Sequence, residues 1–300
     1  MIDSISLIFP HVFDLLTHSL VCTYITPHRT QWELVSRLTA RTSQNSIAPS
    51  FGSSLSMDGD LLAIGSPDER DGAGSVYIFQ DRNTADEVWA LSFKLSPEEV
   101  AAGALFGSSV SVSSGSLAVG APRDTGGGSV FAFKQNENDA WLPEKLVPRD
   151  IEEGDEFGTN VVISGCTIAV SSPQDRTSST SGSGTVRTFN WDDNGGSWVH
   201  SQIVEPLFDA AGGEFGECIA FLGDTLLVAQ SGVIYSFGRL GGVWSQISAI
   251  TQVNFVSEDF GCPLSLSGRN FIVGSRGDSS LGTNSGASFV YDLCPEIEPV

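Results

Sequence analysis

The stretch FGSSVSVSSGSLAVGAPRDTGGGSVFAFKQNENDAWLPEKLV, residues 106–147, decides the fold, and it recurs in whole or part along the chain. It consists of short apolar runs separated by Gly, Ser and Asp. A repeat built from such runs is typical of a radial array of small β-sheets. The sequence therefore predicts an all-β fold made from one repeated unit.

Each unit opens with a strand whose two faces differ. The five copies of this strand begin with Phe-Gly, at Phe51, Phe106, Phe157, Phe215 and Phe260. Large apolar residues occupy positions 1, 5 and 7 of each copy, and the positions between them are mainly small or polar. One face is therefore expected to fill a core, and the other to lie where space is short, as it does at the axis of a β-propeller.

Three further strands complete the unit. A continuous apolar run, such as LLAIG at 61–65, indicates a central strand that is covered on both faces. A third strand begins with Gly and ends with an aromatic residue, as in GSVYIF at 74–79. A fourth begins with Trp, and one copy contains Pro143, which places this strand on an exposed edge. Four strands per unit describe a propeller blade.

The strand count predicts how the ring closes. The chain has five first strands but only four Trp strands after them. Residues 32–38, WELVSRL, supply the missing copy ahead of the first unit. We therefore predict a β-propeller of five four-stranded blades over residues 32–292, in which strand 32–38 pairs with strand 286–292 and completes the last blade. Residues 1–31 are predicted to be an N-terminal extension and residues 293–300 a C-terminal tail.

Composition limits the partners. The formal charge is −21, from 36 acidic and 15 basic residues, which disfavours nucleic acid. The apolar segment from Ile5 to Val21 is interrupted by Pro10 and Asp14, so it predicts no transmembrane span and no clear signal peptide. A frayed extension and a degenerate export signal both fit this segment. We expect a monomer.

The five cysteines form no CxxC pair, so they do not predict a zinc site. Cys218 and Cys262 lie in first strands and are interpreted as small buried thiols. Cys22 and Cys294 flank the two strands of the predicted closure. A disulfide between them is conceivable in an oxidising compartment, although two free thiols are expected.

The motifs resemble a known family. Phe-Gly, then Gly-Ala-Pro at 120–122, then GSVYIF at 74–79 are similar to the FG-GAP repeat of integrin α-chain propellers and of many repeat proteins. The resemblance covers about residues 32–292 and implies a propeller with adhesion or ligand binding at the cell surface. Integrin-type repeats often carry a D-x-D-x-D-G calcium loop, which is missing here, so no cofactor is expected. Those propellers typically have seven blades, whereas five are predicted here.

Two sets of residues are candidates for a site. The first consists of acids around the Phe-Gly motifs, which would share one rim of the tunnel and face a cation or a sugar: Glu156, Glu214, Asp259 and Glu217. Acids that only solubilise these loops are the simpler explanation, because Ser50 and Leu105 occupy this place in the first two units. The second is Arg276-Gly277-Asp278, an integrin-recognition tripeptide, although an Asp near this place recurs in other units, at Asp68, Asp124 and Asp175. No Ser/His/Asp triad can be placed, because only His200 lies within the repeats.

The sequence thus favours a non-enzymatic module that binds a protein or glycan ligand, outside the cell or at its surface. A carbohydrate-active hydrolase that uses the rim acids is the alternative from another class. A purely structural repeat domain is the third.

Overall fold

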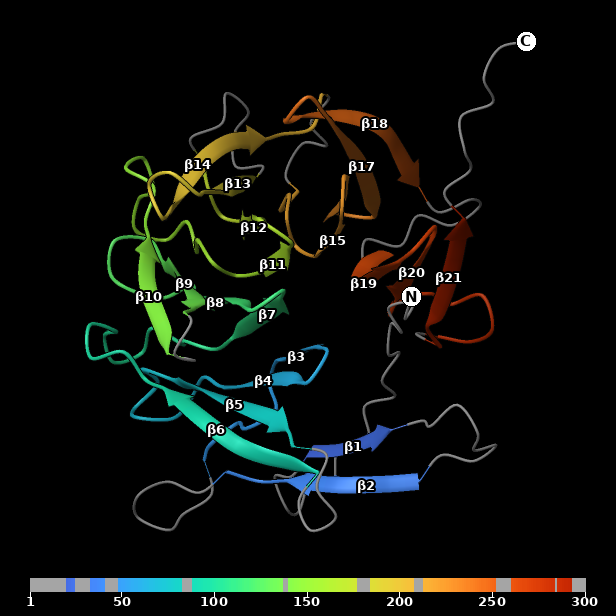
Figure 1. Cartoon of the computed structure of the whole chain (residues 1–300). Helices are drawn as coiled ribbons and strands as arrows, with labels where there is room; N and C mark the ends of the chain where they lie inside the picture. Colours follow the sequence, from blue (N-terminus) through green and yellow to red (C-terminus); the bar gives the residue numbers. More distant parts are fainter. Residues whose placement is uncertain are drawn as a thin grey trace.

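The computed structural model describes residues 20–24, 33–40, 48–82, 88–136, 140–176, 184–207, 213–251, 260–283 and 285–292. Within these ranges the chain is all-β, and it has no helix that is long and apolar enough to cross a membrane. Five antiparallel sheets follow one another around a ring (Figure 1). These five sheets are the five predicted blades of a β-propeller.

Each blade contains its strands in chain order, from the axis outward. Blade one is β3 (Leu55–Asp58), β4 (Leu61–Ser66), β5 (Ser75–Asp81) and β6 (Trp89–Leu95). Blade two is β7 (Ser109–Ser113), β8 (Ser116–Ala121), β9 (Ser129–Gln135) and β10 (Trp141–Leu146). Blade three is β11 (Val161–Ser164), β12 (Thr167–Ser172), β13 (Thr185–Asp192) and β14 (Ser197–Val204). Blade four is β15 (Ile219–Leu222), β16 (Thr225–Gln230), β17 (Val233–Leu240) and β18 (Val243–Thr251). Blade five is β19 (Phe260–Ser267), β20 (Asn270–Ser275) and β21 (Ala287–Asp292).

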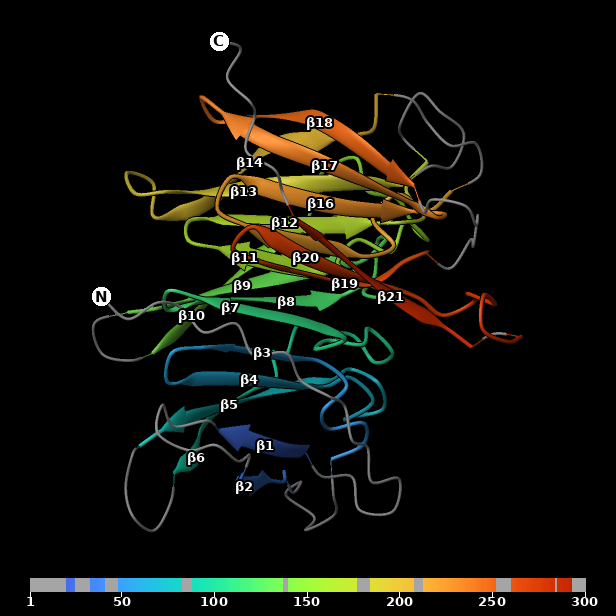
Figure 2. The same cartoon turned by 90° about the vertical axis from the view of Figure 1, so that its right-hand side faces the viewer.

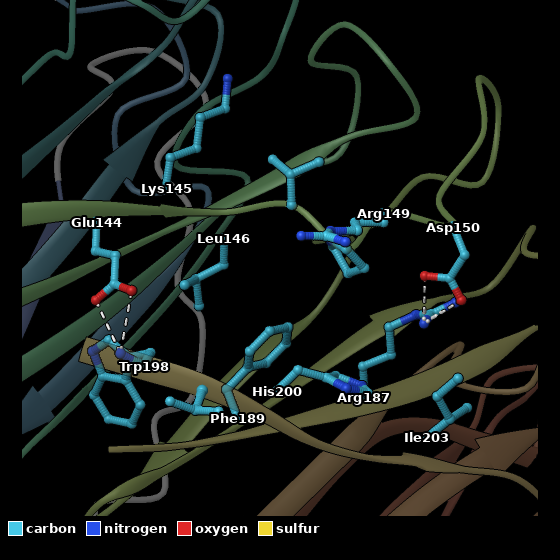
Figure 3. A pocket seen from close by; sticks show the side chains of 13 residues that line it. Glu144, Lys145, Leu146, Arg149, Asp150, Arg187, Phe189, Trp198, His200 and Ile203 are labelled. Atoms are coloured by element: carbon cyan, nitrogen blue, oxygen red, sulfur yellow. Dashed lines mark hydrogen bonds and ion pairs between the residues drawn. The ribbon is translucent and has the colours of Figure 1, made fainter. Parts of the chain in front are cut away.

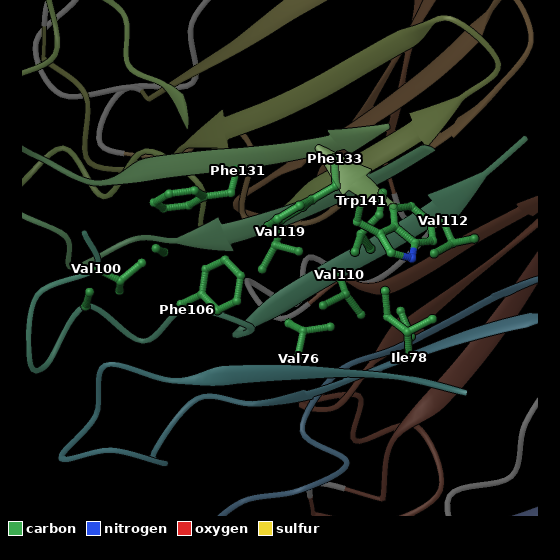
Figure 4. Packing of buried hydrophobic residues seen from close by; sticks show 14 of the residues in the cluster. Val76, Ile78, Val100, Phe106, Val110, Val112, Val119, Phe131, Phe133 and Trp141 are labelled. Carbon is green, nitrogen blue, oxygen red and sulfur yellow. The ribbon is translucent and has the colours of Figure 1, made fainter. Parts of the chain in front are cut away.

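Neighbouring blades lie face to face (Figure 2). Apolar side chains of their strands fill the space between them. Between blades one and two, Val76 and Ile78 of β5 meet Val110 and Val112 of β7 in one buried cluster (Figure 4). The central strand β8 is buried at all six positions, as its unbroken apolar run predicts. Burying side chains of this size contributes about 1.5–3 kcal/mol each, so these clusters hold neighbouring blades together.

The Phe-Gly and Gly-Ala-Pro motifs meet across the blade interfaces. A Cβ atom built on Gly120, the first residue of Gly-Ala-Pro, would lie 2.0 Å from the carbonyl oxygen of Gly158, in the Phe-Gly of the next blade. Gly65 meets the carbonyl oxygen of Gly107 in the same way, also at 2.0 Å. Any side chain at Gly65 or Gly120 would therefore push two blades apart.

The small face of the innermost strands forms hydrogen bonds between blades. Ser109 and Ser111 of β7 accept hydrogen bonds through Oγ from the backbone amides of Val161 and Ile163, both at 3.0 Å. Ser56 of β3 accepts one from Val112 in the same way, at 2.9 Å. An innermost strand has an unpaired edge whose amides need acceptors. The serines of the preceding blade supply these acceptors, and we call this row of contacts the serine seam.

We expect Ser111→Ala to lower the free energy of unfolding by about 1–3 kcal/mol, because the amide of Ile163 then loses its acceptor in a half-buried place. The matched control is Ser265→Ala, at the equivalent position of blade five, where the side chain is exposed. It should change stability by less than about 0.5 kcal/mol. Urea unfolding of both variants measures the difference, and equal effects would contradict the role of the seam.

The predicted closure is wrong. Strand β2 (Glu33–Leu38) pairs with β1 (Leu20–Tyr24), which the sequence analysis had assigned to the extension ahead of the repeats. Strand β21 pairs with β20, so within the described residues blade five has three strands. Strand β1 precedes β2 by only a few residues, whereas β21 lies at the other end of the domain. Pairing β2 with β1 therefore costs less loop-closure entropy than pairing β2 with β21.

The interpretation of Cys218 and Cys262 as free thiols is also wrong. These residues form a disulfide that joins blade four to blade five, with their Cα atoms 5.7 Å apart. Cys218 occupies the position of Ser109, so the disulfide replaces a serine contact of the seam. Cys294 lies outside the described residues, so the structure does not address its pairing with Cys22. Cys166 is free and exposed.

Candidate functional site

A pocket of about 680 Å³ opens on the outer side of the ring, between blades two and three (Figure 3). Strand β10 and the segment that follows it, as far as Asp150, form one wall. Strands β13 and β14 form the other wall. Both β10 and β14 are the outermost strands of their sheets, so the pocket lies between two strand edges.

The buried guanidinium of Arg187 is fixed at this pocket. Its side chain is 1% exposed. Nη1 donates hydrogen bonds to both carboxylate oxygens of Asp150, at 3.1 and 3.0 Å, and Nη2 donates to Oδ2 of the buried Asp175 at 2.9 Å. Thr185 donates a further hydrogen bond to Asp175, at 2.7 Å. The guanidinium is thus a fixed cation between a buried carboxylate and an exposed one.

This ion pair is a variation on a pair found in the first two blades. In each blade except the fourth, the loop after the second strand carries one buried acid: Glu69, Asp124, Asp175 and Asp278. Lys94 and Lys145, from the fourth strands, pair with the first two of these acids. In blade three the cation comes from the third strand instead, where Arg187 replaces the aromatic residue. Ile203 stands opposite Arg187, as Lys94 stands opposite Tyr77.

Neighbouring charges shift the pKa values of several groups near the pocket. Burial, and then the charge of Arg187, lower the pKa of His200, whose ring packs edge-on against Phe189 with centroids 5.4 Å apart. Burial raises the pKa of Asp155, and the charges of Asp175 and Glu152 add to this effect. The lowered pKa favours the neutral imidazole of His200 beside the permanent cation of Arg187.

Each lip of the pocket carries one exposed valine, beside exposed charged residues such as Lys145 and Arg149. Val147, just after β10, is 46% exposed, and Val199 of β14 is 49% exposed. Trp198, which also lines the pocket, is buried, and its backbone amide donates to the carboxylate of Glu144 at 3.0 and 3.2 Å. The site therefore combines a charged base with one solvent-exposed valine on each lip.

The repeat pattern does not predict this pocket, although the sequence of blade three carries a signal for it. The third strand reads GTVRTF in blade three, against GSVYIF and GSVFAF in the first two blades. An arginine at a buried strand position requires a carboxylate partner, which marks the place as unusual. The position of that partner, Asp150, could not be derived from the strand pattern.

Three of the predicted rim acids, Glu156, Glu214 and Glu217, lie ahead of the strands β11 and β15. Glu214 is exposed and accepts a hydrogen bond from the side chain of Gln174, at 2.6 Å. Glu156 has φ 57°, and Ser50 and Leu105, at the same place in the first two blades, have φ 54° and 60°. This conformation therefore belongs to the turn and not to the carboxylate. Among the described residues, which include Glu217 but not Asp259, no group of acids, His or Cys is arranged to hold a metal ion.

The Arg276-Gly277-Asp278 tripeptide does not present its carboxylate. Asp278 is 3% exposed, and it accepts hydrogen bonds from the backbone amide and the hydroxyl of Ser280, at 2.9 and 2.5 Å. It is the blade-five copy of the buried loop acid. The copy in blade one is Glu69, whereas Asp68, which the sequence analysis had compared with it, is exposed.

These features define a β-propeller of Phe-Gly blades with a side pocket. Residues 32–79, 89–133 and 142–189 match the family model described as FG-GAP repeat. These three stretches are therefore FG-GAP repeats, as the motifs predict. A comparison with curated proteins found no match.

Solved structures share the fold. A "putative 6-phosphogluconolactonase" from Bacteroides uniformis ATCC 8492 superposes with a TM-score of 0.57 at 13% identity, over 93% of this chain and 79% of that chain. The corresponding protein of Bacteroides fragilis NCTC 9343 gives 0.55 at 14% identity, over 91% and 77%. At such identities the likeness shows the propeller fold alone.

Proposed function

We propose that the chain is a non-enzymatic module that binds a protein partner, and that the pocket between blades two and three is the contact surface. The observation that carries this proposal is the pair of exposed valines, Val147 just after β10 and Val199 on β14, beside the buried guanidinium of Arg187. Apolar residues around a desolvated centre with an arginine are typical of protein interfaces.

A protein partner fits this site better than a glycan. Sugar rings stack on exposed aromatic faces, whereas Trp198 and Phe189 are 6% and 4% exposed. The carboxylate of Asp150 is 52% exposed, which leaves it accessible to an amide or a cation of an incoming polypeptide. The free edges of β10 and β14 offer backbone groups to an extended segment.

Binding also suits the pocket better than catalysis. Arg187 cannot transfer a proton at neutral pH, and both of its neighbouring carboxylates are engaged in holding it. The hydrolase alternative would depend instead on the rim acids. One of them, Glu214, already accepts a hydrogen bond from the side chain of Gln174. We propose further that binding needs no metal cofactor.

The disulfide supports a place outside the cell or at its surface. Disulfides persist in oxidising compartments and are rare in the cytosol. The Cys218–Cys262 bridge joins two blades across 44 positions of sequence, as a structural disulfide does. Extracellular placement, with adhesion as the purpose of binding, is therefore part of the proposal.

The test uses the folded chain as a probe against a displayed peptide library and a glycan array. We expect peptide binders whose affinity falls at least tenfold in Val199→Arg, because the new charge disrupts one lip of the pocket. Val243→Arg, on the outer strand of blade four, where Val243 is 61% exposed, is the matched control and should keep full affinity.

Other outcomes would overturn the proposal. Glycan ligands alone, or peptide binders unaffected by Val199→Arg, would place the site elsewhere. Loss of binding in EDTA would contradict the absence of a metal requirement. Hydrolysis of a glycan that is abolished by combined Glu156→Gln, Glu214→Gln and Asp259→Asn would establish the enzyme alternative.

A further inference from the structure

The hairpin of β1 and β2 has the register of the two outer strands of a blade. Leu38, the last residue of β2, is paired with Leu20 of β1. The apolar residues at the same place in three blades are paired equivalently: Leu95 with Val76, Val204 with Val186, and Ile250 with Ile234. By this criterion β1 is a third strand and β2 is a fourth strand.

The same hairpin carries the same irregularity. In β1 and β2 the register shifts after Cys22. Ser36 and Leu34 are paired with β1, and Val35 between them has no partner residue. In blade one the register shifts after Ile78, and Ser92 has no partner residue. The shift falls at the same place in both hairpins, because Cys22 lies two positions after Leu20 and Ile78 two positions after Val76. Blades three and four have the shift at this position too. A β-bulge at one fixed position is a specific structural feature.

The packing of Leu38 agrees with this assignment. The last apolar residue of each fourth strand packs against the next blade, as Leu95 does against blade two and Leu146 against blade three. Leu38 is 4% exposed and packs with Phe79 and Trp89 of blade one. The hairpin lies on the side of blade one that faces away from blade two (Figure 1). It is therefore placed as the blade before blade one.

A second strand for this blade can be found in the sequence. In blade one, Leu61 begins the apolar run of the second strand, fifteen residues before Val76. Fifteen residues before Leu20 stands Ile5, which begins the run ISLIF at 5–9. Pro10 comes directly after this run. In blade one, Pro67 comes one residue later, after LLAIG at 61–65 and Ser66.

We infer that the free edge of β1 is a docking edge for residues 5–9 of this chain, and that residues 5–38 are three strands of a sixth blade. In the described residues β1 pairs with β2 alone, which leaves its other edge with amides and carbonyls to satisfy. The register of β4 with β5 predicts that Leu7 lies opposite Cys22, as Ala63 lies opposite Ile78.

The native Cys22 provides the test. In a chain whose Cys166 and Cys294 are replaced by serine, Leu7→Cys should form an intramolecular disulfide with Cys22 on mild oxidation, because directly opposed side chains lie about 4.5–5.5 Å apart at Cβ. Ser6→Cys is the matched control: its side chain faces the other side of the sheet, and it should give at least tenfold less disulfide. Non-reducing peptide mapping measures both yields.

A second measurement does not depend on the new cysteine. Deleting residues 1–12 should speed amide hydrogen exchange in residues 20–24 at least tenfold, while the amides of β8 keep their exchange rates. Equal disulfide yields in the two variants, no disulfide in either, or unchanged exchange after the deletion would overturn the inference. A covalent dimer formed by Leu7→Cys would overturn it too, since the edge would then take a strand from a second copy.

Discussion

Replacing Cys218 and Cys262 together by serine is expected to lower the free energy of unfolding by about 4 kcal/mol, the loop-closure term for a bridge between residues 44 positions apart. The bridge restricts the unfolded chain, and it also stands where a serine of the seam would otherwise join two blades. Blade five has three described strands, so this contact is an important part of its attachment.

Urea unfolding of the double variant measures this loss, and hydrogen exchange shows where it falls. We expect the largest increase in exchange in β19–β21. The matched control is Cys166→Ser, since Cys166 is free and exposed, and this variant should unfold like the native chain. A double variant with native stability would mean that the bridge does not constrain the blades.

The second large effect is expected for Arg187→Met. Removing the guanidinium leaves Asp175, whose side chain is 0% exposed, without its cation, and losing one partner of a buried pair typically costs about 3–5 kcal/mol. The control is Arg269→Met, because Arg269 pairs with Asp292 while their side chains are 62% and 61% exposed, and such surface pairs contribute at most about 1 kcal/mol.

A rescue variant separates the charge from the packing. Adding Asp175→Asn to Arg187→Met removes the uncompensated carboxylate, so it should recover part of the lost stability. If the double variant is less stable than Arg187→Met alone, the buried charge is not the cause of the loss. Thermal unfolding at one pH and one salt concentration is sufficient for the comparison.

The candidate site shows where sequence reasoning reached its limit. Arg187 stands out in the sequence because it interrupts a strand pattern that is otherwise aromatic. Its partners come from two loops, at Asp150 and Asp175, and only the packing of blade two against blade three brings Asp150 to the guanidinium. The prediction of rim acids used position within the unit alone. Position in a repeat gives the height of a residue along a blade but not the contacts of its side chain.

What the sequence determined by itself was the blade. Each blade is built from hairpins between strands that follow one another in the chain, so the alternation of Phe106, Val110 and Val112 and the apolar run of β8 are local signals that are sufficient to predict it. Only the tertiary structure decided the contacts between units, namely the serine seam and the Cys218–Cys262 bridge, and the choice of β1 as the partner of β2. Every unit presents nearly the same edges and faces, so several pairings satisfy the pattern equally well. The choice among them depends on distances across the ring, which only the folded chain defines.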